Sequence, residues 1–146
     1  MKTFTKLVIV VSVVLCCLAQ HVVAAEGEKK LFVNLSSDEI NRAAMAINFS
    51  TRVLKQKKIP VTIFLNVEGV RIADKNLPHH KHINGQSTQE MLKAFIAAGG
   101  KVIICPMCMK NVGRLTPDDI VDGVVVGGSD VTWPALFDDG VRVLSY

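Results

Sequence analysis

The sequence has no apolar run long enough to span a bilayer. Its longest run, Leu7 to Ala19, has 13 residues, whereas a spanning helix needs about 20. Two lysines precede this run, and a pair of small residues ending at Ala25 follows it. Such a pattern is typical of a cleaved secretory signal peptide. We therefore predict a signal peptide at residues 1–25 and an exported chain, periplasmic or extracellular, without membrane attachment after cleavage. A lipoprotein modified at Cys16 or Cys17 and an uncleaved anchor are the alternatives.

The mature chain also lacks a charge excess of either sign. The full sequence has 17 Lys and Arg against 13 Asp and Glu. Two of those lysines, Lys2 and Lys6, lie in the predicted signal peptide, which leaves 15 basic and 13 acidic residues. A nearly neutral domain has no electrostatic footprint for nucleic acid. We therefore expect no nucleic-acid partner, and the remaining residues have the length of one domain.

Cysteine is scarce, and its scarcity is informative. Of four cysteines, Cys16 and Cys17 leave with the signal peptide, so only Cys105 and Cys108 remain. A pair separated by two residues closes too short a loop to staple a fold, which favours redox, nucleophilic or metal chemistry. No phosphate-binding P-loop, dinucleotide fingerprint, nucleophile elbow or zinc-protease motif is present. We expect no organic cofactor.

Apolar runs of strand length alternate with segments of helical period along the mature chain. The predicted strands lie at residues 31–35, 61–66, 102–105, 124–126 and 141–144. The predicted helices lie at residues 36–57, from 87 to the glycines at 99 and 100, from 117, and at 131–137. This alternation predicts one doubly wound α/β domain with a mostly parallel five-stranded sheet and helices on both faces.

Two capping boxes mark predicted helix starts. Ser36 with Glu39, and Ser87 with Glu90, have the spacing in which a serine and a carboxylate satisfy each other's backbone N–H groups. Residues 67–85 lie between a strand and the second box and read as a long irregular loop, a length more common in functional loops.

Several polar, small or nucleophilic residues follow the predicted strands directly. In doubly wound sheets ligands bind at the carboxyl ends of the strands, where strand order reverses. We expect the cysteine pair to lie in that crevice. The candidate binding residues at these ends are Ser36, Ser37, Gly127, Gly128 and Ser129.

The cysteine pair opens a predicted helical turn. If Cys105 is the N-cap, Pro106 takes the first helical position, which suits its fixed φ and missing N–H. The Cys105 sulfur would then face free backbone N–H groups, which stabilise a thiolate, and Lys110 and Arg114 would add positive charge. An inert buried cysteine is the alternative. A thioredoxin-like protein fits less well, because this motif follows the third strand and Gly113 interrupts the helix early.

The sequence resembles the DsrE/DsrF-like family of sulfur-relay proteins in four features. These are the opening strand that ends in Ser36 and Ser37, the long first helix, the segment GGKVIICPMCMKNVG and the following LTPDDIVDGV. The resemblance covers residues 30–146. It implies a flavodoxin-like fold, assembly as trimers or hexamers, and a persulfide carried on the cysteine that corresponds to Cys105. Cys108 and the predicted signal peptide depart from the family's basic pattern.

The resulting hypothesis is an exported persulfide carrier or sulfurtransferase-like protein with catalytic Cys105 and with Cys108 as its resolving thiol. Its partners would be sulfur donor and acceptor proteins or small sulfane-sulfur compounds. We expect a homo-oligomer. Its expected apolar surface comprises Met107, Met109, Val112 and Trp133.

A different class of protein remains as an alternative. The chain could be a non-catalytic binding or assembly module that holds copper or zinc, because thiolate and imidazole ligands suit these metals. Candidate ligands for such a site are Cys105, Cys108, His79, His80 and His82.

Overall fold

The computed structural model describes residues 28–146. The predicted signal peptide therefore lies outside the described residues and stays a prediction. No described helix is long and apolar enough to cross a membrane.

Five strands form one sheet in the order β4-β3-β2-β1-β5. All four strand pairs are parallel. The strands are β1 (Lys30–Leu35), β2 (Val61–Leu65), β3 (Lys101–Ile104), β4 (Val124–Val126) and β5 (Val141–Ser145). The predicted α/β class is confirmed, and each predicted strand is present to within about a residue at its ends.

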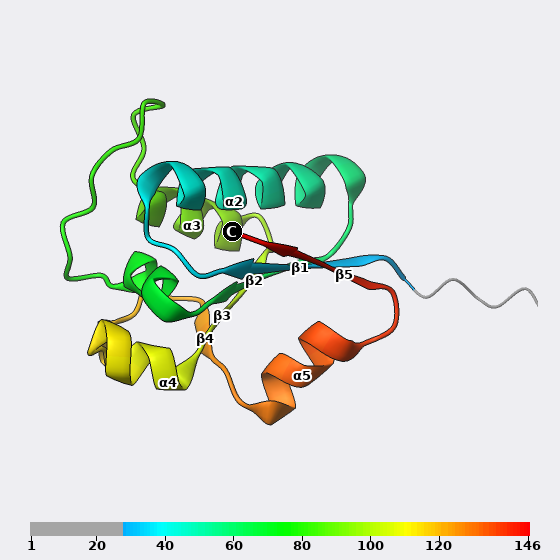
Figure 1. The fold of residues 1–146 in the computed structure, drawn as a ribbon. Helices are drawn as coiled ribbons and strands as arrows, with labels where there is room; N and C mark the ends of the chain where they lie inside the picture. Colours follow the sequence, from blue (N-terminus) through cyan, green and yellow to red (C-terminus); the bar gives the residue numbers. More distant parts are fainter. Residues whose placement is uncertain (1–27) are drawn as a thin grey trace, which may run out of the picture.

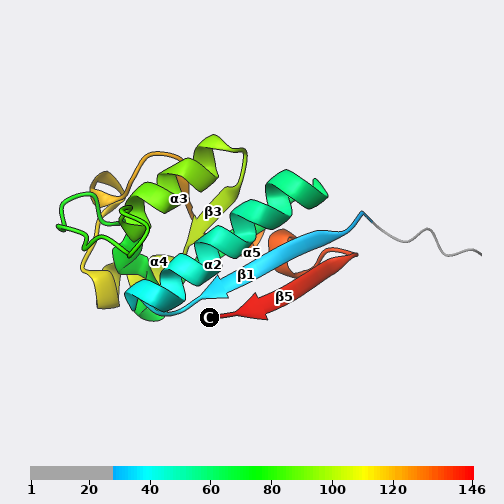
Figure 2. The same ribbon diagram turned by 90° about the horizontal axis from the view of Figure 1, so that it is seen from above.

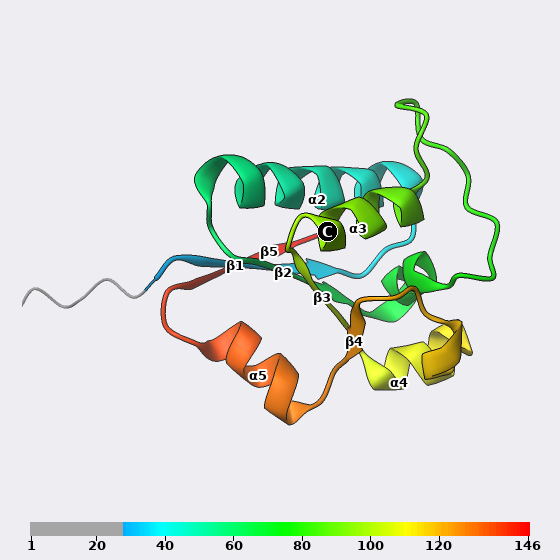
Figure 3. The same cartoon turned by 180° about the vertical axis from the view of Figure 1, so that it is seen from behind.

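Helices cover both faces of the sheet (Figure 1). On one face lie α2 (Ile40–Arg52), which continues as a short π-helix η2 (Val53–Lys57), and α3 (Thr88–Ala97). The other face carries α4 (Pro106–Cys108), which continues as η4 (Met109–Gly113), and α5 (Ser129–Phe137), as the view from behind shows (Figure 3). Two 3₁₀ segments complete the chain: η3 (Val67–Ala73) and η5 (Pro117–Asp119).

The main core lies between the sheet and the helices α2 and α3. Alternate residues of β1, among them Val33 and Leu35, are fully buried against α2, whose Ala43 and Ile47 are also fully buried. Phe95 of α3 closes this core. Small residues on α2 let the helix approach the sheet closely and keep the core densely packed.

The opposite face is covered more thinly. Phe32 and Phe64 lie there with ring centroids 5.8 Å apart. One of the two helices over this face, α5, has no buried residue. Strand β5 forms an outer edge of the sheet beside β1 (Figure 2). Val143 of β5 is 51% exposed.

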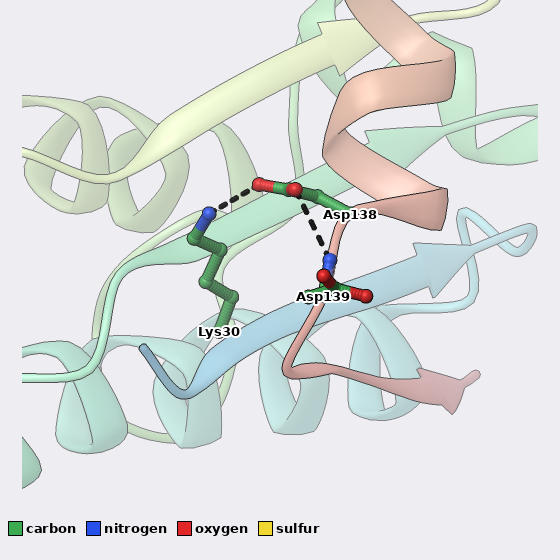
Figure 4. Close-up of polar contacts among 3 residues, drawn as sticks. All are labelled: Lys30, Asp138 and Asp139. Atoms are coloured by element: carbon green, nitrogen blue, oxygen red, sulfur yellow. Dashed lines mark hydrogen bonds and ion pairs between the residues drawn. The ribbon is translucent and has the colours of Figure 1, made fainter. Parts of the chain in front are cut away.

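A polar contact fixes the loop between α5 and β5 to the start of β1 (Figure 4). Lys30 Nζ donates a hydrogen bond to Asp138 Oδ2, and the backbone N–H of Asp139 donates to Asp138 Oδ1 over 3.1 Å. The hydrogen bond raises the pKa of Lys30 and lowers the pKa of Asp138. Both groups are solvent-exposed, so the contact positions the loop more than it stabilises the fold.

Two predictions about local structure are wrong. Ser36 and Glu39 form no capping box. Instead, Ser36 Oγ donates to Tyr146 O over 2.8 Å, and Glu39 itself caps α2 by accepting from the N–H groups of Asn41 and Arg42. The segment after β2 is also not irregular throughout, because η3 forms its first seven residues.

The second predicted capping box is confirmed. Ser87 Oγ accepts from the N–H of Glu90 over 3.1 Å, and Glu90 accepts from the N–H of Ser87 over 2.7 Å. The helix predicted from Pro117 is only the single turn η5, which the capping pair Thr116 and Asp119 begins.

Candidate functional site

The carboxyl ends of adjacent strands are joined by backbone hydrogen bonds. The N–H of Cys105 donates to Leu65 O over 2.8 Å, and the N–H of Gly127 donates to Ile104 O over 2.8 Å. The N–H of Asn66 donates to Leu35 O over 3.1 Å. Cys105 therefore lies between the end of β2 and the end of β4, at the edge where parallel α/β sheets place their reactive groups.

The predicted position of the cysteines in the crevice needs a correction. The chain adds β2, β3 and β4 in one direction from β1 and then returns to place β5 on the other side of β1. Strand order therefore reverses between β1 and β5. Cys105 follows β3, so it lies at the correct edge but is separated from the reversal by β2 and β1.

Cys105 occupies the N-cap of α4 with Pro106 at the first helical position, as predicted. Its sulfur, however, accepts no capping hydrogen bond from the turn. The turn is only three residues long and passes at once into η4, so it has little dipole to stabilise an anion. Lys110 and Arg114 are both exposed on η4 and at its end.

The two thiols face each other. Both cysteines are free and half-buried, and Cys108 packs against the edge of the core. The side chain of Cys105 lies close enough to Cys108 to affect its ionisation. Burial raises the pKa of Cys108 most, and the adjacent Cys105 raises it further. Cys108 therefore keeps its proton where an ordinary cysteine begins to ionise.

Two residues that the sequence reasoning missed also act on Cys108. The backbone N–H of Val67 lowers the pKa of Cys108, and the carboxylate of Glu68 raises it slightly. Both residues begin η3, directly after β2. Their position just after β2, the strand that neighbours β3, was the sequence signal that could have identified them. We did not use it because we expected an irregular loop there.

The serines predicted to bind a ligand are engaged with the backbone. Ser36 Oγ bonds to Tyr146 O, and Ser37 Oγ accepts from the N–H of Glu39 over 3.1 Å. Ser36 lies beside the strand reversal, whereas Cys105 is two strands away. The structure thus does not bring these serines together with the thiols as neighbours in the sheet.

The predicted glycine turn lies beside the end of β3. Gly127 follows β4 next to Cys105, and a Cβ atom there would lie 2.7 Å from Thr132 Oγ1 and 3.1 Å from Ile104 O. Gly128 caps α5, which begins at Ser129. A glycine at position 127 is therefore required because α5 and the end of β3 leave no room for a side chain there.

The histidine loop forms a separate hollow. His79 and His80 line a pocket of about 240 Å³ together with Arg71 and Asp38, and neither cysteine lines it. His79 Nε2 lies 3.0 Å from Asp74 O. Among residues 28–146, no group of three or more His, Cys, Asp or Glu side chains could hold a metal ion. The candidate metal ligands are thus not gathered into one centre.

The comparisons with known proteins agree with this architecture. YchN from E. coli has 17% sequence identity and a TM-score of 0.65, covering 81% of this chain and 99% of its own. MTH1491 from Methanobacterium thermoautotrophicum, a protein of unknown function, has 12% identity and a TM-score of 0.62, with the same coverage. At these identities the likeness shows the fold alone. No curated protein matches the sequence.

A family model provides the stronger relationship. The model of the DsrE/DsrF-like family matches residues 29–146, which is the whole described domain apart from its first residue. The resemblance of the cysteine segment, the five-stranded parallel sheet and this match agree, and the chain belongs to the DsrE/DsrF-like family.

Proposed function

We propose that this protein is an exported persulfide carrier or sulfurtransferase-like protein in which Cys105 accepts sulfane sulfur. The family is generally related to sulfur relay. The observation that carries the proposal is the pair of free, neighbouring thiols at the carboxyl end of β3. Half-buried thiols at this edge are accessible to a donor while being partly shielded from bulk solvent.

Loading of Cys105 is a thiol exchange. The Cys105 thiolate attacks the outer sulfur of a hydropersulfide or polysulfide. A bond forms between Cys105 Sγ and that sulfur, the donor's S–S bond breaks, and the donor thiolate leaves with the electron pair. Transfer reverses this step on an acceptor thiolate, which attacks the outer sulfur and releases Cys105.

Cys108 provides a second route out of the persulfide. Its thiolate attacks Cys105 Sγ, a Cys105–Cys108 disulfide forms, and hydrosulfide leaves with the electron pair. This step reduces the sulfane sulfur and oxidises the two cysteines. An external dithiol must then reduce the disulfide before the next cycle.

The proposal is tested by incubating the reduced mature chain with polysulfide and with a low-molecular-weight hydropersulfide, followed by intact-mass spectrometry. We expect an adduct with the mass of one sulfur atom that dithiothreitol removes. A Cys105→Ser variant should show no adduct. Absence of the adduct from the unmodified chain with every donor would refute the proposal.

Export is part of this proposal and is supported by the sequence of residues 1–25. N-terminal sequencing of the secreted chain should begin at Glu26. A full-length chain retained in the cytoplasm would contradict export.

We also propose that the mature chain is a homo-oligomer, as a trimer or hexamer. The support is the thinly covered face of the sheet, where Trp133, Phe137 and Val143 are 62%, 74% and 51% exposed. Met107 is exposed as expected, whereas Met109 is buried in the core and cannot contribute to such a surface. Large apolar side chains exposed on α5 and β5 are of the kind that protein interfaces cover.

A further inference from the structure

The pocket that His79 and His80 line takes no part in the proposed sulfur chemistry. It has a volume of about 240 Å³. Its other polar walls are Asp38, which follows β1, Arg71 of η3 and Thr88, the first residue of α3. The starts of α2 and α3 lie at the same end of the molecule (Figure 1). Sites for drug-sized molecules measure about 300–1,000 Å³, so a ligand of this pocket would be small.

Thr88 contributes a hydroxyl group that has no partner. The residue lines the pocket and is only 4% exposed. Within residues 28–146 its hydroxyl makes no hydrogen bond. It is not needed to cap α3, because Ser87 and Glu90 do so. A nearly buried polar group without a partner is costly unless a ligand or water satisfies it, so Thr88 is available to a polar ligand.

The charged groups of the pocket have opposite signs. Arg71 Nη1 donates to Asp38 Oδ2 over 3.2 Å, and both side chains are partly exposed. This contact uses one of the five N–H donors of the guanidinium and one of the two carboxylate oxygens. The other N–H groups of Arg71 can bind a carboxylate, and the other oxygen of Asp38 can accept from an ammonium group. Asp38 would repel a simple anion, whereas a zwitterion complements both charges.

The loop that closes the pocket is held in place by one backbone carbonyl. Asp74 O accepts from Gln89 Nε2 over 2.6 Å and lies 3.0 Å from His79 Nε2. A carbonyl oxygen only accepts, so His79 Nε2 carries the hydrogen and donates it. The remaining lining residues are apolar: Ile40, Ile72, Leu77 and Pro78. The pocket is thus preformed, with apolar wall for a short hydrocarbon side chain.

We propose that this pocket binds a small α-amino acid with a short apolar side chain. The carboxylate of the ligand bonds to Arg71 and Thr88, and its ammonium group bonds to Asp38. In the empty pocket the ion pair leaves neither charge isolated, and the ligand adds a partner to each. The inference is independent of the proposed function, because neither cysteine lines the pocket.

Titration of the isotope-labelled mature chain with L-alanine, followed through its amide NMR signals, tests this proposal. Propionate lacks the ammonium group of alanine, and ethylamine lacks its carboxylate. Alanine should shift the amide signals of Asp38, Arg71 and Thr88, and each fragment should bind about tenfold more weakly, the effect of losing one hydrogen bond between charged groups. Propionate that binds as tightly as alanine, or pocket signals that do not move at about 10 mM alanine, would overturn the proposal.

Variants separate binding from a purely structural role. Arg71→Gln and Asp38→Asn should each weaken alanine binding about tenfold. Arg52→Gln is the matched control, because Arg52 is exposed at the other end of α2, and it should bind normally.

Thr88→Val gives a second, independent readout. It should weaken alanine binding about two- to tenfold without lowering the stability of the ligand-free chain in urea, because the hydroxyl has no partner there. Equal affinities of Arg71→Gln and Arg52→Gln would refute the proposal. A Thr88→Val chain that is less stable but binds alanine normally would do the same.

Discussion

At the scale of single residues, the site combines what the local sequence reveals with what only tertiary contacts impose. Cys105 as N-cap and Pro106 after it were predictable, because a cysteine and a proline at a strand end have a limited set of conformations. Val67 was not predictable, since a valine gives no local signal for a left-handed conformation. Its conformation follows from the close approach of Gly69, two residues later in η3, to Leu35 at the end of β1.

The strain at Val67 leads to a stability prediction. Replacing it with glycine, Val67→Gly, should raise the free energy of unfolding by about 0.5–1 kcal/mol. The left-handed conformation costs a non-glycine residue about 1–2 kcal/mol, of which the added freedom of glycine in the unfolded chain offsets about 0.5–1 kcal/mol. Val67 is 41% exposed, so the packing lost with its side chain is smaller than for a core valine.

Urea unfolding of the reduced mature chain measures this change. The variant keeps the backbone N–H, so Cys108 alkylation should be unaltered. Ile83→Gly is a suitable control, because Ile83 is 97% exposed and is not a positive-φ residue. A Val67→Gly variant less stable than the unmodified chain would contradict the claim of strain.

At the scale of elements, the helix starts show where sequence reasoning works and where it fails. The box at Ser87 and Glu90 is local and is present as predicted. The box at Ser36 and Glu39 had the same spacing, but Ser36 Oγ instead donates a hydrogen bond to the carbonyl of Tyr146, 110 residues further along the chain. A residue at a strand end can join the sheet ladder, and no short window of sequence shows which partner it will have.

The capping carboxylates predict a loss of stability in acid. A backbone hydrogen bond from Ser87 lowers the pKa of Glu90. Its contribution is therefore fully present above the ordinary carboxyl pKa of about 4.3 and is lost as the pH falls through the lower folded value. Glu90→Gln should reduce stability at neutral pH, and its difference from the unmodified chain should shrink below about pH 4.

Urea unfolding at several pH values checks this dependence. Asp122 is an exposed carboxylate outside the helices, so Asp122→Asn serves as a control. A difference between Glu90→Gln and the unmodified chain that grows as the solution becomes more acidic would reverse the predicted sign and reject the capping role.

At the scale of the whole molecule, alternation of strands and helices was sufficient to predict the α/β class but not the order of strands. Buried apolar runs such as 61–65 and 101–104 read clearly as central strands. The position of β5 beside β1 depends on the path of α5. That helix has no buried residue, so its sequence did not indicate where the chain would return to the sheet. This is why the cysteines were expected at the strand reversal and lie two strands from it.

The exposed edge and face around β5 predict self-association. Light scattering of the mature chain should give a mass of several chains, and Val143→Lys should lower it by placing a charge in the apolar face. Ile83→Lys adds the same charge in a loop and should leave the mass unchanged. A mass of one chain for the unmodified protein would remove the basis for an oligomer on this face.

Whether Cys105 carries sulfane sulfur can be read from the peptide that contains both cysteines. Reduced mature protein is incubated with polysulfide, freed of excess donor and digested, and the peptide that contains both cysteines is analysed in the unmodified, Cys105→Ser and Cys108→Ser chains. We expect a one-sulfur adduct that persists longest in Cys108→Ser and is absent from Cys105→Ser. An adduct that survives Cys105→Ser, or no adduct in any of the three, would contradict this expectation.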